Sequence, residues 1–511
     1  MRDVRVRFAP SPTGALHIGG VRTALYNYLL ARKHNGTMIL RIEDTDQTRY
    51  VAGAEEYIQR SLEWVGIKID EGVGPGGPHA PYRQSERKDI YRQYALQLIE
   101  NGHAYYAFDT KEEEEAMRSR LEAAGVVSPQ YNSITRMQMR NSLTLPEDEV
   151  RQLLESGAPY VVRLKVPRKE GIRFNDLIRG WVNVHSSQID DKVLLKGDGM
   201  PTYHLANVVD DYLMKISHVI RGEEWLPSAP LHVLLYRFLG WENEMPLFAH
   251  LPLLLKPDGN GKLSKRDAVR FGFPIFPLNW NDEASGELSV GFRESGYLPE
   301  ALINFLALLG WNPGNDRELF TMEELIEEFS LERINKAGAR FDIQKAQWFN
   351  QHYLRHLPDE TLAAFLLESV VKEGISCSEN KAKKIATIMR DRVTFPTDLW
   401  EQGRFFFQAP AKFDEGVLNK KWNQDVVRVV TAFKDGIVNQ TTWTADIAKS
   451  TLEEVAGSLN IGVGKVLQAL RVALTGASGG PDLMMIMEII GKDEVVSRLT
   501  FALQNFKVKV A

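Results

Sequence analysis

At 511 residues the chain exceeds one ordinary hydrophobic core, and about three to five compact domains are expected. Its composition, 44% hydrophobic and 25% charged, is typical of a soluble globular protein, with no apolar run of membrane-spanning length, and the single Cys377 excludes an intrachain disulfide or a cysteine-based metal cage. The net charge is −5, and residues 336–511 hold 23 Lys/Arg against 20 Asp/Glu, a basic surplus too small to predict nucleic-acid binding by itself.

The amino terminus runs from Met1 directly into an alternating, strand-like stretch over residues 4–8. It has neither the apolar core of a signal peptide nor an Arg/Ser-rich presequence. Together with the single cysteine, this favours the cytoplasm as the location, and no association with a membrane is expected.

The next 35 residues or so predict a loop, a helix and a second strand. After a Pro/Gly-containing loop over residues 9–14, apolar side chains recur at one-face helical spacing, at Val21, Ala24, Leu25, Tyr28 and Leu29. Gly36 is placed to end the helix in a left-handed conformation, and residues 37–42 resemble a buried strand. A βαβ unit of a parallel sheet is therefore expected, as in nucleotide-binding α/β domains.

Further along the chain the α/β pattern is interrupted and then resumes. A Gly/Pro-rich loop covers residues 72–81. An inserted domain is expected after it, with a charged helix over residues 111–124 and short strands over 160–166 and 181–185. The α/β pattern returns near Tyr203. Helical periodicity dominates from about residue 336, so the carboxyl-terminal third is expected to be all helical.

The junction between the first strand and the first helix carries a candidate phosphate-binding loop, Pro10-Ser11-Pro12-Thr13-Gly14-Ala15-Leu16-His17-Ile18-Gly19-Gly20. Its prolines and glycines shape a tight loop that a nucleotide can approach, and the helix amino terminus directs unpaired N–H groups at phosphate. His17 is placed to hydrogen-bond a phosphoryl oxygen. A motif this short is more often a simple turn when it occurs alone.

A second candidate loop, Lys262-Leu263-Ser264-Lys265-Arg266, follows a Gly-rich turn over residues 257–261. Three cations in five residues are often only a solvated turn. Adenylate formation, however, requires cations that close onto the charge developing as pyrophosphate leaves the α-phosphate. Lys262 and Lys265 suit that catalytic role.

The two loops, about 245 residues apart, resemble the signature motifs of class I aminoacyl-tRNA synthetases. Four runs between them resemble the glutamyl branch of that family: residues 41–46 (RIEDTD), 82–87 (YRQSER), 201–211 (PTYHLANVVDD) and 219–225 (VIRGEEW). The resemblance implies that ATP, accompanied by Mg²⁺, contacts Pro10, Gly14, His17, Gly19, Gly20, Lys262, Ser264 and Lys265. Gly20 replaces the second histidine of the general signature, so His17 is expected to make more of the phosphate contact.

The resemblance also implies a fold and an activity. The fold is a Rossmann-like α/β core with an inserted α+β domain, followed by an all-α anticodon-binding region. The expected division is 1–96, catalytic domain, first half; 97–203, tRNA acceptor-binding domain; 204–253, catalytic domain, second half; 254–335, connecting domain with the KLSKR loop; and 336–511, anticodon-binding region. The implied activity joins L-glutamate to the 3′ end of tRNA(Glu) through glutamyl-adenylate, in a monomer.

Two arginines are the candidate readers of the glutamate side chain. A buried carboxylate must be paired, and guanidinium can grip both of its oxygens. Arg7 ends the first strand and Arg221 ends a later apolar run, so both are expected at the carboxyl edge of one sheet, where α/β ligands bind. Surface arginines are the alternative. By resemblance, the other glutamate-binding residues are Ser11, Glu43, Tyr203 and Asn207, although Tyr203 could also be a core aromatic.

No structural zinc is expected in the inserted domain. Some relatives bind zinc there through a C-x-C pair, but residues 106–110 contain no cysteine. Magnesium is expected only as the companion of the ATP phosphates.

Basic residues cluster in the helical third, at Lys381, Lys383, Lys384, Arg390 and Arg392. The cluster is either a solvated helix face or, by resemblance, a surface facing the anticodon, with Arg392 near the position that reads its third base. The aromatic residues Trp400 and Phe405 to Phe407 are expected to pack in a core rather than stack on bases.

Other classes of protein share some of these motifs, and each predicts a different sequence feature. A glutaminyl-tRNA synthetase would need a neutral amide reader in place of Arg221, and a tRNA-modifying paralogue would lack about 175 residues of helical extension. A non-catalytic tRNA-binding paralogue predicts eroded ATP motifs, and a small-molecule nucleotidylyltransferase has no use for the extension. A non-discriminating enzyme that also charges tRNA(Gln) stays open.

Overall fold

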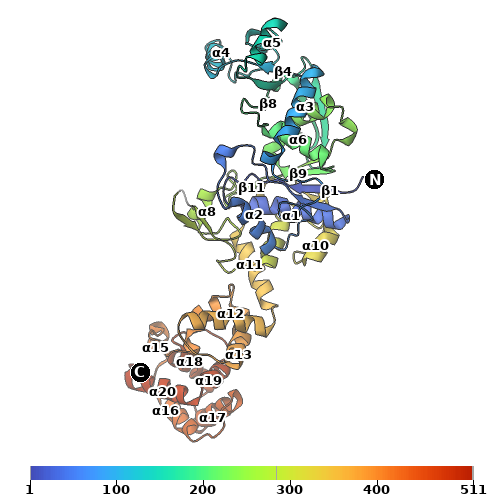
Figure 1. The fold of residues 1–511 in the computed structure, drawn as a ribbon. Coiled ribbons are helices and arrows are strands. Elements are labelled where there is room, and N and C mark those ends of the chain that lie inside the picture. The colour runs from blue at the N-terminus through green and yellow to red at the C-terminus, as the bar shows by residue number, and fades with distance from the viewer. Residues whose placement is uncertain (1, 283–284, 509–511) are drawn as a thin grey trace. The chain divides into compact units, whose positions relative to one another are not determined.

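The computed structural model describes residues 2–282 and 285–508, apart from the side chains of residues 265, 268 and 269. It contains two compact units, one formed by Met1–Ser295 and Pro299–Ala346, the other by Gly296–Leu298 and Gln347–Ala511. Figure 1 shows the elements of both. Within the described residues, no helix combines the length and the apolar character needed to cross a bilayer.

The predicted βαβ unit is confirmed. Strand β1 (Arg5–Phe8) leads through α1 (Ile18–Lys33) to β2 (Thr37–Leu40), which pairs parallel with β1 in the register Arg5↔Thr37. After α2 (Ala54–Trp64), β3 (Glu71–Gly72) adds a third parallel strand, so Gly72 lies in a strand and not only in the predicted loop. Apolar residues of α1, including Val21, Leu25 and Leu29, are fully buried, which explains the helical period.

The prediction for Gly36 is wrong. Asn35 takes the left-handed conformation after α1, with φ of 50°. Gly36 is needed for a different reason, because a Cβ at this position would lie 2.2 Å from the Val4 carbonyl oxygen. Glycine allows the turn to approach the start of β1 closely.

The second half of the sheet system brings a later strand against β1. Strand β9 (His218–Gly222) pairs parallel with β10 (Leu247–Leu251), β10 with β6 (Gly171–Asp176), and β6 antiparallel with β7 (Gly180–His185). The backbone N–H of Ser217, just before β9, donates to the Arg5 carbonyl oxygen at 2.8 Å. Helices α6 (Tyr203–Leu213) and α7 (Ala229–Phe238) frame β9 in the sequence.

The predicted helix and strands of the inserted segment are present. Strands β4 (Ala104–Ala107), β5 (Val161–Leu164) and β8 (Val193–Leu195) form an antiparallel sheet. It is accompanied by α3 (Lys88–Glu100), α4 (Lys111–Ala123) and α5 (Glu147–Glu155). In Figure 1, α4 and α5 lie beside β4 at one end of the first unit, while α1 and α2 lie beside β1.

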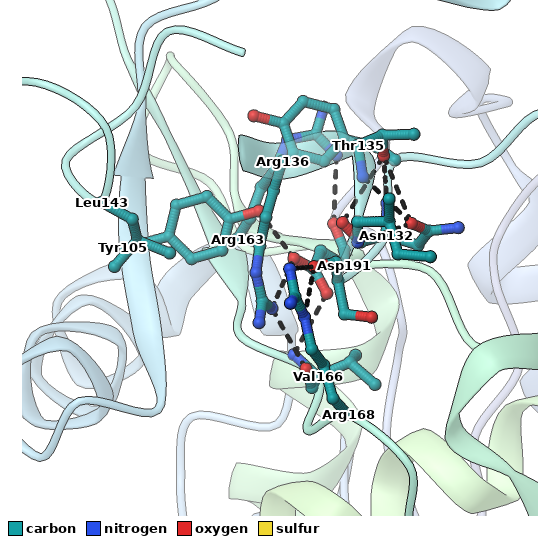
Figure 2. Close-up of polar contacts among 12 residues, drawn as sticks. Tyr105, Asn132, Thr135, Arg136, Leu143, Arg163, Val166, Arg168 and Asp191 are labelled. Carbon is teal, nitrogen blue, oxygen red and sulfur yellow. Dashed lines mark hydrogen bonds and ion pairs between the residues drawn. The ribbon is translucent and has the colours of Figure 1, made fainter. Parts of the chain in front are cut away.

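A buried polar network holds the inserted segment together. Figure 2 shows Asp191 at its centre, where the carboxylate accepts hydrogen bonds from the Tyr105 hydroxyl (2.8 Å), Arg136 Nη1 (3.0 Å) and the Val166 N–H (3.1 Å). Arg163 Nη1 donates to the Asp191 carbonyl oxygen at 3.1 Å. Burial raises the pKa of Asp191, although Arg136 and Tyr105 act in the opposite direction.

The run without cysteine, residues 106–110, contributes hydrogen bonds to the same segment. Asp109 accepts from the Tyr131 hydroxyl at 2.8 Å and from the Arg140 N–H at 2.7 Å. Asn141 donates to the Tyr131 hydroxyl at 3.2 Å and to the Arg136 carbonyl oxygen at 2.7 Å. These contacts tie the loops of the segment to its strands.

The remainder of the first unit consists of short elements: β11 (Leu254–Leu255), α8 (Lys265–Phe271), β12 (Trp280–Asp282), β13 (Glu287–Ser289), α9 (Pro299–Ala307), α10 (Met322–Glu328), β14 (Ala339–Arg340) and the start of α11 (Ile343–Arg355). Strand β14 pairs parallel with β11. The expectation of helices alone from about residue 336 is therefore wrong at residues 339–340.

The second unit contains only helices in its described part: α12 (Asp359–Lys372), α13 (Glu379–Met389), α14 (Asp398–Glu401), α15 (Glu415–Lys421), α16 (Gln424–Val438), α17 (Ala445–Ser458), α18 (Leu467–Thr475), α19 (Leu483–Ile490) and α20 (Lys492–Asn505). Trp400 and Phe406 are buried in an apolar core of this unit, with Phe405 and Phe407 packed against it. Core packing of these aromatic residues is confirmed.

Candidate active site

One cavity of about 650 Å³ lies in the first unit, at the carboxyl ends of β1, β2 and β9. This is the edge at which open α/β sheets bind ligands. All but two of the residues expected to bind substrates line it: Arg7, Pro10, Ser11, Gly14, His17, Gly19, Gly20, Glu43, Tyr203, Asn207, Arg221, Lys262 and Ser264. Of the other two, the side chain of Lys265 lies outside the described residues, and Arg392 belongs to the second unit.

The amino terminus of α1 faces the cavity, and His17 is its cap. The Gly19 N–H donates to His17 Nδ1 at 2.8 Å. Because Nδ1 accepts, the neutral ring carries its proton on Nε2, the atom suited to donate to a phosphoryl oxygen. Glycine is also favoured at position 20 for a steric reason, since a Cβ there would lie 2.6 Å from Leu16 Cδ1.

The cationic loop lines the same cavity through Lys262, Leu263 and Ser264. Lys262 Nζ contacts Glu224 Oε1 at 2.7 Å, and the Ser264 N–H donates to Asp267 Oδ2 at 2.9 Å. Burial would raise the pKa of Glu224, but the hydrogen bond from Lys262 holds it below its ordinary value. Lys262 is more than half exposed, so its ammonium group can leave Glu224 at little cost.

Glu43 also lines the cavity and is held by two donors. Its Oε1 accepts from Arg41 Nη2 and from Asn207 Nδ2, both at 3.0 Å. Arg41 is fully buried and also donates to Asp211 Oδ1 at 2.8 Å. Burial alone would lower the pKa of Arg41, yet the charges of Asp211, Glu43 and Asp210 raise it well above its ordinary value.

The two predicted carboxylate readers have different surroundings. Arg7 donates through Nε (3.0 Å) and Nη2 (3.3 Å) to the carboxylate of Asp211, so its charge is already paired. Arg221 donates to the Tyr203 hydroxyl (2.6 Å) and to His250 Nε2 (3.0 Å). It is 5% exposed, and no carboxylate of the described residues lies within salt-bridge distance of it. Arg221 therefore presents an unpaired charge to the cavity.

Aromatic side chains enclose Arg221. The Tyr203 ring lies 4.5 Å from the Trp225 ring, measured between centroids, and 5.5 Å from His232. His204 Nδ1 is 3.3 Å from His232 Nε2. Burial lowers the pKa of His204 to about 4 and holds the pKa of His232 well below its ordinary value, so both rings are neutral at pH 7.

Four functional candidates were missed from the sequence: Arg41, Asp211, Asp176 and His250. Arg41 and Asp211 lie in runs that carry the family resemblance, and an arginine within an apolar strand is a signal that it has a buried partner. His250 and Asp176 lie at the ends of strands far apart in the sequence, so only the sheet pairing brings them together.

Arg392 lies in the short 3₁₀ turn Arg390–Arg392 of the second unit and is exposed. Three of its basic neighbours are held by acidic residues: Lys383 by Glu360, Lys384 by Glu488 and Arg390 by Asp359. Among the described residues, Arg392 has no such ion pair. Its guanidinium group is therefore available to a ligand from solution.

The first unit combines a parallel βαβ core, a helix amino terminus with a capping histidine, and a cationic loop around one cavity. These features define a nucleotide-binding enzyme with the class I synthetase architecture. The family described as "tRNA synthetases class I (E and Q), catalytic domain" matches residues 3–348, and "Anticodon binding domain" matches residues 354–503. The chain belongs to the class I glutamyl- and glutaminyl-tRNA synthetase family.

Individual relatives match over the full length. The glutamate–tRNA ligase of Cytophaga hutchinsonii is 64% identical over 510 residues, covering 100% of this chain and 99% of the relative. That of Amoebophilus asiaticus is 59% identical and covers 98% of each chain. A glutamate tRNA ligase from Elizabethkingia meningosepticum, solved in complex with its amino acid, is 51% identical with a TM-score of 0.96, covering 99% of this chain and 100% of that one.

Proposed function

We propose that this chain is a glutamate–tRNA ligase that activates L-glutamate with ATP and transfers it to the 3′ end of tRNA(Glu). The observation that carries the choice of amino acid is the buried, unpaired guanidinium of Arg221 in the cavity. Burying a cation to 5% exposure without an anion has a large desolvation free energy, and a bound substrate carboxylate would offset it. A neutral glutamine side chain would not.

The other glutamate contacts follow from the atoms that the protein leaves unused. Arg7 donates to Asp211 through Nε and Nη2, so Nη1 is the atom that would donate to the substrate. Glu43 accepts from the protein through Oε1, which leaves Oε2 for the substrate ammonium group. Ser11, Tyr203 and Asn207 complete the pocket.

The first chemical step joins an α-carboxylate oxygen of glutamate to the α-phosphorus of ATP, and the bond from that phosphorus to pyrophosphate breaks. His17 Nε2, the amino terminus of α1, Lys262 and Lys265 bind the phosphates and neutralise the charge of the leaving group. Mg²⁺ bound with ATP would help to neutralise the phosphate charge, and few protein ligands would be needed because this ion keeps several of its waters.

In the second step the terminal ribose hydroxyl of tRNA attacks the activated carbonyl, the bond from that carbonyl to the phosphate oxygen of AMP breaks, and the hydroxyl proton passes to the leaving phosphate. Positioning and charge stabilisation account for this step without a side-chain base. The inserted segment, residues 97–203, would bind the acceptor end, and Arg392 would contact the anticodon. The five-part division, a monomeric state and a cytoplasmic location belong to the same proposal.

Charging of tRNA tests the proposal. The purified protein is incubated with ATP, labelled L-glutamate and total tRNA, and label in acid-precipitable RNA is counted. A failure to label tRNA would overturn the proposal. Separate reactions with tRNA(Glu) and tRNA(Gln) distinguish a discriminating enzyme from one that charges both.

Arg221→Ala tests the assignment of the amino acid. It should reduce the use of glutamate far more than the binding of ATP, because only the substrate carboxylate loses its partner. An equal loss of both would instead give Arg221 a structural role.

A further inference from the structure

Arg221 is held by a hydrogen-bonded chain whose other two members, His250 and Asp176, lie outside the runs that carry the family resemblance. Arg221 and His250 are register partners on the neighbouring parallel strands β9 and β10. Arg221 Nε donates to His250 Nε2 at 3.0 Å, and His250 Nδ1 lies 2.6 Å from Asp176 Oδ2 at the end of β6. His250 and Asp176 are almost completely buried. Three adjacent strands thus contribute one side chain each.

The contacts of Asp176 fix its orientation and its charge. Its Oδ1 accepts from the backbone N–H groups of Ile178 (3.0 Å) and Arg179 (2.8 Å). Burial would raise the pKa of Asp176, but His250 and these N–H groups hold it below its ordinary value. The carboxylate is therefore ionised at neutral pH, and Oδ2 can only accept from His250.

The contacts of His250 then allow one proton arrangement. Asp176 requires a proton on Nδ1, and the Nε–H of Arg221 requires a lone pair on Nε2. A proton on Nε2 would place two donors against each other at 3.0 Å. Burial lowers the pKa of His250 in spite of the hydrogen bond to Asp176, which agrees with a neutral ring.

A neutral acceptor has a different effect on Arg221 from that of a carboxylate. Arg7 and Arg41 are both held by Asp211, which shares their charge. His250 orients Arg221 equally well, but it contributes no negative charge. No carboxylate of the described residues contacts Arg221 directly, so its charge is available to a ligand that enters the cavity.

We infer that Asp176 and His250 are positioning residues that set the preference of this site for a substrate carboxylate over a carboxamide. The inference rests on the proposed function, in which Arg221 receives the glutamate side chain. His250 orients the guanidinium without neutralising it, and Asp176 selects the tautomer that makes this possible.

Two substitutions at one position separate the hydrogen bonds. The amide nitrogen of Asn in His250→Asn takes the place of Nδ1 and keeps the donor to Asp176, but it removes the acceptor for Arg221. The amide oxygen of Gln in His250→Gln reaches the place of Nε2 and keeps that acceptor. Asp176→Asn leaves His250 free to adopt the wrong tautomer. His218→Gln is the matched control, because His218 lies on β9 and bonds Ser217 rather than Arg221.

The measurements are KM for glutamate, KM for ATP and kcat in tRNA charging, together with calorimetric binding of L-glutamate and L-glutamine to the full chain. His250→Asn and Asp176→Asn should raise KM for glutamate about tenfold or more, with kcat and KM for ATP within about twofold of wild type. The preference for glutamate over glutamine should fall by the same factor. His250→Gln and His218→Gln should stay within about threefold of wild type.

Two results would overturn the inference. One is an equal KM for glutamate in His250→Asn and His250→Gln, and the other is an equal loss in kcat, KM for ATP and KM for glutamate, which marks a structural role. A wild-type protein that charges no tRNA with glutamate would instead overturn the proposed function. The two failures are distinguished by the wild-type reaction.

Discussion

Replacement of Arg41 by methionine removes the central cation of a buried charge cluster. Arg41 contacts Asp211 at 2.8 Å, Glu43 at 3.0 Å and Asp210 at 3.9 Å, while Arg7 and Arg87 are bound to Asp211 and Asp210. The three guanidinium groups balance three carboxylates, so Arg41→Met leaves one uncompensated buried negative charge. Breaking a buried pair from one side costs about 3–5 kcal/mol in the free energy of unfolding.

Hydrogen–deuterium exchange of peptides covering residues 37–46, followed across a urea series, reports on this unit alone. Arg32→Met is the matched control, because Arg32 pairs with Asp70 at the partly exposed end of the neighbouring helix and should cost at most about 1 kcal/mol. Arg41→Met should also raise KM for glutamate, since Glu43 loses a donor. A loss no larger than that of the control would refute the view that the cluster is held by charge balance.

Three further predictions concern the turn, the cationic loop and the histidine pair. Gly36→Ala should destabilise the first unit by more than about 2 kcal/mol, since its Cβ would lie 2.2 Å from the Val4 oxygen; an unchanged urea midpoint would contradict this. Lys262→Ala should lower kcat for tRNA charging about 100-fold and leave calorimetric glutamate binding unchanged, and a loss of binding instead would exclude the phosphate role. The pKa of His204 is about 4 in the folded protein and higher in the unfolded protein, so the contribution of His204 to the free energy of unfolding is constant above about pH 6.5. That free energy should fall by at most about 3 kcal/mol as the pH drops from there towards 4. His204→Gln should make the urea midpoint less dependent on pH between pH 7 and 5, and an equal pH dependence in the variant and the wild type would refute the assignment.

The βαβ core and the loop residues could be predicted because their signals are local. Helical periodicity over Val21 to Leu29 reports burial on one face, and the helix amino terminus is set by the residues next to it. The position of the loop Pro10 to Gly20, between the first strand and the first helix, could therefore be predicted from local residues. Core packing was also expected for Trp400 in preference to base stacking, and this residue is buried in a core.

Other features could not be predicted because they depend on neighbours that are distant in the sequence. Gly36 looked like a cap, but the requirement for glycine comes from Val4 of the strand before the helix. Strand β14 is two residues long and exists only because β11 lies beside it. His250 and Asp176 lie 74 positions apart, and no periodicity connects them.

The contrast between Arg7 and Arg221 shows why residue type alone does not define a specificity site. Both are arginines near the ends of parallel strands, both line the cavity and both are about 95% buried. Arg7 is bound bidentately to Asp211, and an arginine so paired offers an oriented donor but little net charge. Among the described residues, Arg221 is bound by neutral acceptors alone, so it retains its charge at the desolvation cost that a bound carboxylate would offset. A site can discriminate between a carboxylate and an amide only if the desolvation cost of its arginine is not already offset by a protein carboxylate. The charge of the residues that bind an arginine therefore decides its function as much as the arginine itself does.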